Sequence, residues 1–473
     1  FDVSTVMVWL RNDLRLSDNP ALDAARRSGE RVVALYVHET DEAIRAPGGA
    51  ARWWLHRSLT ALGKDLADKG IALRVENGRA AEVVERIRSD AEAGAVHWNR
   101  RYAPGQREAD AAVKAELRKQ GVDVRSHAGN VLLEPWEIET GHGKPYSVFT
   151  PFWKALKERD IARPLPQSAK GKNVTAGQID SDYRQPEWAG KLTQYWDIGE
   201  AAAQERLEQF LEECVEDYPK GRDYPARAVT SHLSAHVRFG EISPRQIWHT
   251  AWAFAHAHPD STSAVEKFLS ELAWRDFSYH QLYHRDDIAN KPMQAKYGDL
   301  KWRHAPEQLK AWKTGQTGIP IIDAGMRELW ETGYMHNRVR MLVASFLTKN
   351  LLIDWREGEH WFWDCLVDAD DANNPASWQW VAGSGLDAAP YFRIFNPVTQ
   401  GERFDPDGDY VRRWVPEVTA LPDKFIHDPS QAPERVLEKA GIVLDETYPR
   451  AIVDLKETRR RALDAFGALS AEA

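Results

Sequence analysis

The chain has 473 residues, 43% hydrophobic and 28% charged, which excludes a wholly disordered, collagen-like or disulfide-stapled protein. Its two cysteines are too few for a disulfide framework, a four-thiolate zinc site or a cysteine-ligated iron–sulfur cluster, so we expect no metal. The net charge is −9, so any nucleic-acid surface must be a local basic patch.

The first 130 residues alternate short β-branched runs with longer helical patterns, as in a parallel sheet covered by helices. Strands are predicted at 5–9, 31–37, 71–76, 95–99 and 122–126, and crossover helices at 50–63 and 80–93. We therefore predict a doubly wound α/β domain over residues 1–130. The glycine fingerprint of dinucleotide binding does not follow the first strand.

The rest of the chain has a different texture. Residues 131–200 are predicted to connect two domains, because periodicity is lost between 161 and 191. Residues 201–473 are predicted to form an all-α domain without sustained strand patterns. Its helices are expected at 201–214, 244–256, 264–283, 305–312, 320–332 and 337–351.

Tryptophan is the unusual residue type. The chain has 20, and ten of them lie between Trp274 and Trp414, a density that ordinary core packing does not require. No apolar run approaches the roughly 18 residues that span a bilayer, and no secretion signal is recognisable at the start. We therefore expect a cytoplasmic protein that does not enter a membrane.

Three segments of the second half carry groups suited to binding. The hydroxyls of Thr230, Ser231 and Ser234 precede a helical stretch and could hold a phosphate, although composition alone favours a helix cap and its turn. Glu271, Trp274, Arg275 and Ser278 share one helical face. That face suits a flat polar ligand, and a core tryptophan beside a solvated ion pair is the even alternative.

The third segment offers Asn337, Arg338 and Met341 on one side of a helical turn, with Arg340 pointing elsewhere. Arg340 requires a carboxylate, and the segment from Asp368 to Asp370 supplies two. Further on, Asn374 and Trp378 share a helical face that Trp380 does not. His336 could act as a base, but a histidine near a turn is more often structural.

Several longer motifs occur in order across nearly the whole chain, at 9–20 (WLRNDLRLSDNP), 323–327 (DAGMR), 335–341 (MHNRVRM), 378–380 (WQW) and 387–397 (DAAPYFRIFNP). In these motifs the sequence resembles the DNA photolyases of the photolyase/cryptochrome superfamily, in the branch that acts on cyclobutane pyrimidine dimers. Bacterial class III, which is related to plant cryptochromes, is the favoured subgroup, and class I is the alternative.

The resemblance implies that FAD binds within the helical domain. The positions that match family contacts to FAD are Tyr218, Thr230, Ser231, His232, Leu233, Ser234, Arg275, Arg340, Asp368, Ala369, Asp370 and Asn374. Arg340 would pair with Asp368 beside the flavin ring, and Asn374 would face flavin N5. An amide there cannot deliver a proton as readily as a carboxylic acid, which favours the fully reduced anion that repair requires.

The resemblance also separates the tryptophans by role. Trp378, Trp355 and Trp302 match, from flavin to surface, a triad that passes electrons inward to photoreduce FAD. Trp274 and Trp380 match the walls of the pocket that receives the extruded dimer. The positions that match contacts to the dimer or to DNA phosphates are Arg222, Glu271, Asn337, Arg338, Met341 and Arg393.

A second, antenna chromophore is implied as well. The folate site of class I enzymes uses a carboxylate and a cysteine, whereas this chain has Gln106 at the acidic position and no cysteine in 288–291. We expect 5,10-methenyltetrahydrofolate bound in another way, with a deazaflavin as the alternative. The cleft near Arg11, Glu39 and Arg52 is the expected place.

The implied activity is that of a deoxyribodipyrimidine photo-lyase, in which light drives an electron from reduced FAD into the dimer, the cyclobutane ring splits and the electron returns. The alternative is a cryptochrome-like blue-light sensor without repair, against which Asn374, Met341 and the pair of Trp274 and Trp380 count. A (6-4) photoproduct enzyme is a third reading, but that branch has histidine where Met341 stands. UV-damaged DNA is the expected partner of a monomeric protein.

Overall fold

The structure is a computed structural model that describes residues 4–28, 31–167, 179, 185–285 and 287–471. The chain divides into two compact units. The first comprises residues 1–216, 231–286 and 368–372, and the second comprises 217–230, 287–367 and 373–473. The first unit therefore includes segments from the part expected to be purely helical. The expected domain bounds at 130 and 200 stay a prediction, and residues 168–178 and 180–184 of the expected connector lie outside the described residues.

The first unit is built on a parallel sheet of five strands in the order β3-β2-β1-β4-β5. The strands are β1 Thr5–Leu10, β2 Arg31–Glu39, β3 Ala72–Gly78, β4 Ala93–Asn99 and β5 Asp123–His127. The predicted strands are confirmed to within two residues at each end, because β-branched runs bounded by turns are a strong signal. The doubly wound α/β fold is confirmed.

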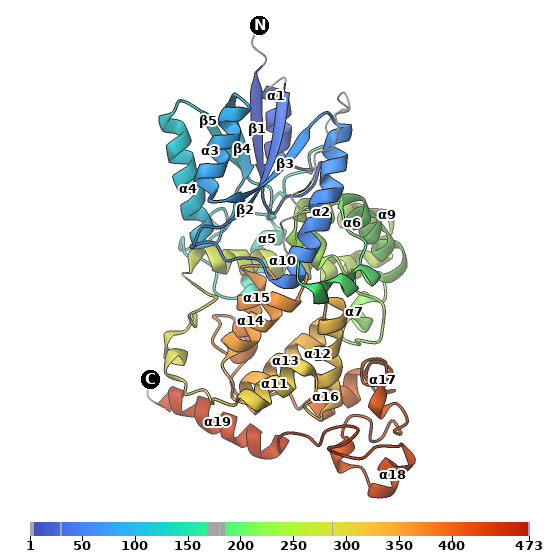
Figure 1. The fold of residues 1–473 in the computed structure, drawn as a ribbon. Coiled ribbons are helices and arrows are strands. Elements are labelled where there is room, and N and C mark those ends of the chain that lie inside the picture. The colour runs from blue at the N-terminus through green and yellow to red at the C-terminus, as the bar shows by residue number, and fades with distance from the viewer. Residues whose placement is uncertain (1–3, 29–30, 168–178, 180–184, 286, 472–473) are drawn as a thin grey trace. The chain divides into compact units, whose positions relative to one another are not determined.

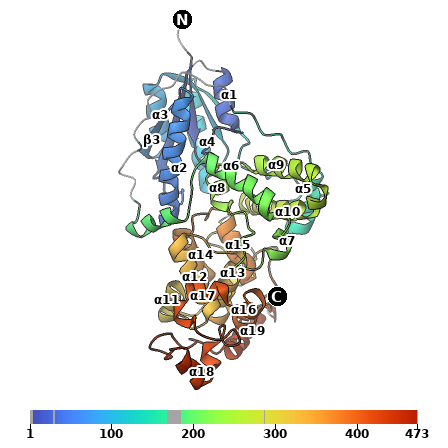
Figure 2. The same ribbon diagram turned by 90° about the vertical axis from the view of Figure 1, so that its right-hand side faces the viewer.

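Four helices cover the sheet, α1 Pro20–Ser28 and α2 Gly49–Asp68 on one face, α3 Ala80–Asp90 and α4 Pro104–Lys119 on the other (Figure 1 and Figure 2). This arrangement follows from right-handed crossovers on either side of β1. Apolar residues of the sheet, α3 and α4 form a continuous buried core that includes Trp9, Ile87 and Trp98.

The point where the strand order reverses, between β1 and β4, is filled by the protein's own side chains. Arg11 is only 4% exposed; it donates to the Asp110 carboxylate at 2.7 Å and to the Asn99 carbonyl at 2.6 Å. Arg101 pairs with Asp110 and with Glu39. Doubly wound sheets commonly bind ligands at this point, which buried ion pairs occupy here.

Two histidines link the neighbouring strands β4 and β5. Nδ1 of His97 lies 2.9 Å from Nε2 of His127, and the two rings stack at 5.2 Å. A bond between these nitrogens requires one of them to be unprotonated. Burial lowers the pKa of both imidazoles, that of His127 to about 4.

Acidification is therefore expected to destabilise the protein through this histidine pair. The pKa of a histidine in the unfolded chain is 6.5, and that of His127 in the folded protein is about 4. Between these two pH values the folded state binds fewer protons than the unfolded chain. The free energy of unfolding should fall as pH falls through that window, by roughly 1 kcal/mol after allowance for partial exposure. Urea unfolding at pH 7 and pH 5 measures the effect. His127→Gln should weaken the dependence, to which His97 and His280 also contribute through their lowered pKa values, and exposed His142→Gln should keep it in full. The reverse pattern would exclude the pair as a cause.

Further helices complete the first unit: α5 Phe149–Lys157, η1 Glu187–Gln194, α6 Glu200–Gln209, η2 Phe210–Cys214, α8 Ser234–Arg238, α9 Pro244–Ala257, η3 Pro259–Ser261 and α10 Thr262–His284. The helix predicted at 201–214 is α-helical only to Gln209 and ends in a π-turn, η2. Helix α9 begins with a reciprocal capping box between Ser243 and Gln246, which fixes its first turn.

The second unit is helical in its described residues, apart from one isolated bridge between Leu444 and Tyr448. Its elements are α7 Tyr218–Gly221, η4 Ala295–Asp299, α11 Pro306–Thr314, α12 Pro320–Thr332, α13 Asn337–Ser345, η5 Phe346–Asn350, α14 Trp355–Cys365, α15 Asn373–Ala382, α16 Pro397–Phe404, α17 Asp409–Trp414, η6 Pro416–Val418, η7 Pro429–Gln431, α18 Glu434–Lys439 and α19 Leu455–Ala471. Throughout the described part of the chain, every helix is too short or too polar to span a bilayer.

Candidate active site

In the first unit, the hydroxyl segment lies beside an acidic segment. His232 adopts a left-handed backbone (φ 52°), and the Ser231 hydroxyl accepts from the backbone N–H of Leu233 at 3.4 Å. Ser234 begins α8, where its hydroxyl donates to the Asp368 carboxylate at 2.6 Å. The N-cap residue of α8 is Leu233, which makes no side-chain cap bond, whereas the Ser231 hydroxyl closes a turn, so the structure shows the predicted turn without the cap.

The acidic segment 368–372 is held rigidly by backbone and side-chain bonds. The Ala369 carbonyl accepts from Nε of Arg238 at 2.7 Å, and the Asp370 carboxylate accepts from the backbone N–H of Ala372 at 2.9 Å. Asp368 and Asp370 are both buried, and buried carboxylates require such donors. The segment therefore presents fixed acceptors next to the hydroxyls of Ser231 and Ser234.

Helix α10 places the predicted stripe on one face, as expected. Trp274 is half-buried and stacks on Phe149, with ring centroids 3.9 Å apart. Arg275 donates to the Asn130 carbonyl at 2.8 Å, and Glu271 forms an exposed pair with Lys267 at 3.3 Å. One side of the Trp274 ring thus packs in the protein, and ligand binding by this helix face stays a prediction.

In the second unit, Asn374 on α15 is oriented by Glu359 on α14. Its amide nitrogen donates to the Glu359 carbonyl at 2.9 Å and to the Glu359 carboxylate at 3.0 Å. The opposite orientation would direct the amide oxygen at two acceptors, so Nδ2 is committed to Glu359 and Oδ1 remains as an acceptor. Sequence patterns missed Glu359, because it is 15 positions from Asn374 on a different helix.

Trp378, one turn after Asn374, sits in a tight aromatic seat. Its ring meets Phe362 at 4.9 Å and Trp312 at 6.0 Å, both edge to face. A Cβ on Gly358 would lie 2.1 Å from the Trp378 ring, so only glycine fits there. Trp355, at the start of α14, is also buried, whereas Trp302 is partly exposed and packs against Phe466 of α19. Burial thus decreases toward the proposed outer end of the triad.

Helix α13 separates its polar side chains as the spacing predicts. The Asn337 amide lies 3.9 Å from the Met341 sulfur, and Arg338 pairs with Asp223 at 3.0 Å. Arg340 points to the other side, where Nε donates to the Met335 carbonyl at 2.6 Å. The pairing of Arg340 with Asp368 stays a prediction. His336 caps α13 through Nδ1, which confirms its structural interpretation.

The remaining predicted contacts lie in both units. Trp380 is half-buried, Arg393 is exposed beside the 58% exposed Phe392, and the Arg222 guanidinium lies 5.5 Å from the Tyr218 ring. Of the residues that the resemblance assigns to FAD, Tyr218, Thr230, Arg340 and Asn374 belong to the second unit and the others to the first. Their roles stay predictions.

Residues 6–170 match the family model of DNA photolyase, and residues 268–468 match that of the FAD binding domain of DNA photolyase. A deoxyribodipyrimidine photo-lyase of Agrobacterium fabrum is 46% identical over 474 residues, which cover 98% of each chain. The chain belongs to the DNA photolyase family. A crystal structure of a bacterial class III photolyase from Agrobacterium tumefaciens aligns with TM-score 0.94 and 45% identity, covering 99% of this chain and 98% of that one. Cryptochrome-1 of Arabidopsis thaliana is 36% identical over 97% of this chain and 70% of its own.

The side chains present fit the FAD of the photolyase family. An amide oxygen that can accept, at Asn374, suits a flavin N–H group. The Ser231 hydroxyl accepts from Leu233 and keeps its proton for a phosphate or ribose oxygen, whereas the Ser234 hydroxyl donates to Asp368 and suits a donor such as a ribose hydroxyl. The apolar seat of Trp378 keeps an easily oxidised ring out of water.

The residues expected near an antenna chromophore form contacts within the first unit. Gln106 donates to the Asp371 carboxylate at 3.2 Å, and Arg11 and Glu39 are engaged in the ion pairs at the switch point. Elsewhere in the first unit, a cavity of about 600 Å³ is lined by residues of α5, α9 and α10 and of the segment after α5.

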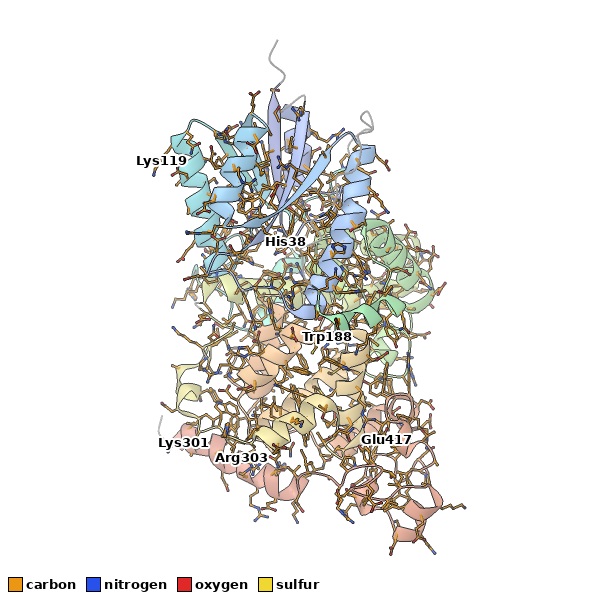
Figure 3. All side chains as sticks on the ribbon, in the orientation of Figure 1. His38, Lys119, Trp188, Lys301, Arg303 and Glu417 are labelled. Atoms are coloured by element: carbon orange, nitrogen blue, oxygen red, sulfur yellow. The ribbon has the colours of Figure 1, made fainter. Side chains whose placement is uncertain are left out.

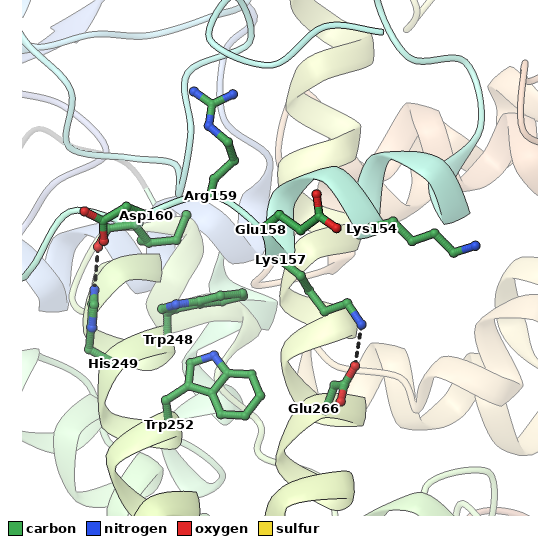
Figure 4. A pocket seen from close by; sticks show the side chains of 10 residues that line it. Lys154, Lys157, Glu158, Arg159, Asp160, Trp248, His249, Trp252 and Glu266 are labelled. Atoms are coloured by element: carbon green, nitrogen blue, oxygen red, sulfur yellow. Dashed lines mark hydrogen bonds and ion pairs between the residues drawn. The ribbon is translucent and has the colours of Figure 1, made fainter. Parts of the chain in front are cut away.

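This cavity is lined by two indoles and by charged side chains of both signs (Figure 4). Trp248 and Trp252 are four residues apart on α9, with ring centroids 6.1 Å apart. Lys154 and Lys157 come from α5, and Lys157 pairs with Glu266 at 2.6 Å. The i, i+4 spacing of the two tryptophans in the helix predicted at 244–256 could have indicated two indoles on one helical face. The pair lies outside the tryptophan-rich stretch from Trp274 to Trp414, and no role was predicted for it from the sequence.

Proposed function

We propose that this protein splits cyclobutane pyrimidine dimers in DNA as a light-driven deoxyribodipyrimidine photo-lyase. The carrying observation is the 46% identity over 98% of both chains to a deoxyribodipyrimidine photo-lyase. Bound, reduced FAD supplies an electron on absorbing blue light and takes it back after the ring opens. The chain's own part is to orient that cofactor, to admit the flipped dimer and to exclude water.

Each group of residues has a separate task in this proposal. Asn374, aligned by Glu359, accepts a hydrogen bond from the flavin and has no acidic proton to donate. Trp302, Trp355 and Trp378 carry electrons inward to restore the reduced cofactor. Trp274 and Trp380 stack on the flipped bases and Glu271 hydrogen-bonds them, while Arg222, Arg338 and Arg393 hold phosphates, with Asn337 and Met341 beside the dimer.

The decisive experiment is repair of thymine dimers in single-stranded DNA by the FAD-loaded, reduced protein, under blue light and in the dark. We expect repair in light alone. The cryptochrome relative makes a sensor without repair the second candidate. FAD binding and a light response without repair would favour that candidate and contradict the proposal.

Trp274→Ala is expected to weaken binding of dimer-containing DNA about tenfold or more, because one stacked base contributes roughly 1–3 kcal/mol. The Phe149 ring supports the indole and should stay in place. A filter or fluorescence titration measures the affinity. Trp136→Ala removes another exposed indole of the first unit that has no assigned role, and it should leave the affinity unchanged. Equal losses of affinity in both variants would mean that Trp274 serves protein packing and does not contact the dimer.

The antenna is proposed to be 5,10-methenyltetrahydrofolate in the cavity lined by Trp248 and Trp252, with a deazaflavin as the alternative. An indole face suits a flat conjugated ring, and Lys154, which also lines the cavity, suits a negatively charged tail. The absorbance of pigment released on denaturation identifies the chromophore. Trp252→Ala should release it while FAD is retained, and its retention would move the antenna back to the switch point. Class III membership, a monomer and a cytoplasmic location complete the proposal.

A further inference from the structure

Lys349 is a fully buried lysine in the π-turn η5 of the second unit. Its Nζ donates to the Tyr391 carbonyl at 3.2 Å and lies 3.7 Å from the centroid of the Phe466 ring. Among the residues that the structure describes, no carboxylate forms an ion pair with it. A buried amine without a counter-charge favours its neutral form, and burial lowers the pKa of Lys349 to about 7.

The ring that carries this amine also contacts Trp302. The centroids of Phe466 and Trp302 are 6.1 Å apart, with the rings edge to face, within a cluster that includes Leu300, Leu352 and Tyr391. Nζ of Lys349 can therefore be no farther than about 10 Å from the Trp302 ring, a range at which charges interact strongly in a protein interior.

Other ionisable side chains lie in or beside this cluster. They are Tyr297 on η4, Tyr391, Arg461 on α19 and Arg303, whose side chain lies beside α19 (Figure 3). Burial raises the pKa of Tyr297 above its usual 10, and arginines stay protonated. The pKa of Lys349, about 7, places the change of its charge between pH 6 and 8.5.

We propose that Lys349 is a positioning residue that acts on the electron wire, the proposed electron-transfer triad of Trp302, Trp355 and Trp378, through its charge. Its neutral amine permits a positive charge on the oxidised Trp302 ring, whereas its ammonium form destabilises that charge. This rests on the proposed role of Trp302. In the step concerned, one electron leaves Trp302 for the oxidised indole of Trp355, which leaves a radical cation on Trp302. The thiolate form of a thiol reductant in solution later returns one electron and becomes a thiyl radical. No proton is transferred, and Lys349 acts only through its field.

The first test needs no activity. Carbon-13 NMR of the lysine side chains in the full chain, with the Lys349 signal identified by its loss in Lys349→Met, gives the titration of the amine directly. We expect a midpoint near pH 7. A titration midpoint near pH 10 would overturn the proposal, independently of whether the tryptophans transfer electrons.

The second test follows the Trp302 radical by transient absorption between pH 6 and 8.5. We expect its yield to rise roughly three- to tenfold with pH in the wild type and to stay at the high value in Lys349→Met. Lys301→Met removes an exposed lysine next to Trp302 and should keep the wild-type profile. A pH-dependent yield in Lys349→Met overturns the inference, whereas a radical that persists in Trp302→Phe overturns the proposed wire instead.

Discussion

Photoreduction of the Trp378→Phe variant is expected to be roughly a hundredfold slower than that of the wild type, the factor that about 2.7 kcal/mol of added barrier produces. Phenylalanine fills most of the seat between Phe362 and Trp312 but is far harder to oxidise than an indole. The inward path therefore loses its innermost step while the fold around Gly358 is preserved. Flash photolysis or the rate of bleaching under steady blue light measures the change.

The matched control is Trp312→Phe. Trp312 is fully buried, contacts the same ring and donates from Nε1 to the Val343 carbonyl at 3.0 Å, so its loss costs comparable packing. We expect photoreduction within about twofold of the wild type there. Trp378→Phe reduced chemically beforehand should repair dimers almost normally. Loss of repair in that pre-reduced variant would mean that Trp378 serves cofactor binding and is not part of a wire.

Local sequence patterns predicted most helices and strands of this fold. The features that they did not predict depend on tertiary contacts. The five strands and the helix 320–332 followed from period and turn residues. The division of 337–351 into α13 and the π-turn η5 could not be foreseen, because a π-turn arises from local packing of residues such as Lys349 and has no sequence period of its own. Assignment of residues 231–286 to the unit of the sheet likewise depends on contacts distant in sequence.

The candidate site was predictable where one helix carries it. Helical spacing placed Asn374 beside Trp378, and Asn337 beside Met341. The partners from other elements were invisible: Glu359 that turns the Asn374 amide, and Lys349 near Trp302. The family resemblance implied roles for residues of the matched motifs, but it gave none for the supporting residues Glu359 and Lys349.

The most recognisable motif, DAGMR at 323–327, has a structural role in this fold. Asp323 accepts from the backbone N–H groups of Thr317 and Gly318, and from the hydroxyls of Thr317 and Tyr448. Arg327 binds Glu417 through two contacts of 2.8 Å. A motif can therefore identify a family without touching the chemistry, because a fully satisfied buried carboxylate tolerates few substitutes.

Asp323→Ala is accordingly expected to lower the free energy of unfolding by about 3–5 kcal/mol, since it leaves four buried donors without an acceptor. Burial raises the pKa of Asp323 to about 6, so at pH 7 the carboxylate is ionised and accepts all four bonds. Thermal or urea unfolding of the whole protein at pH 7 measures the loss. Asp423→Ala, which removes a largely exposed carboxylate paired with Arg412, should cost less than about 1 kcal/mol. Similar losses in the two variants would show that the four bonds to Asp323 contribute no more than a surface pair.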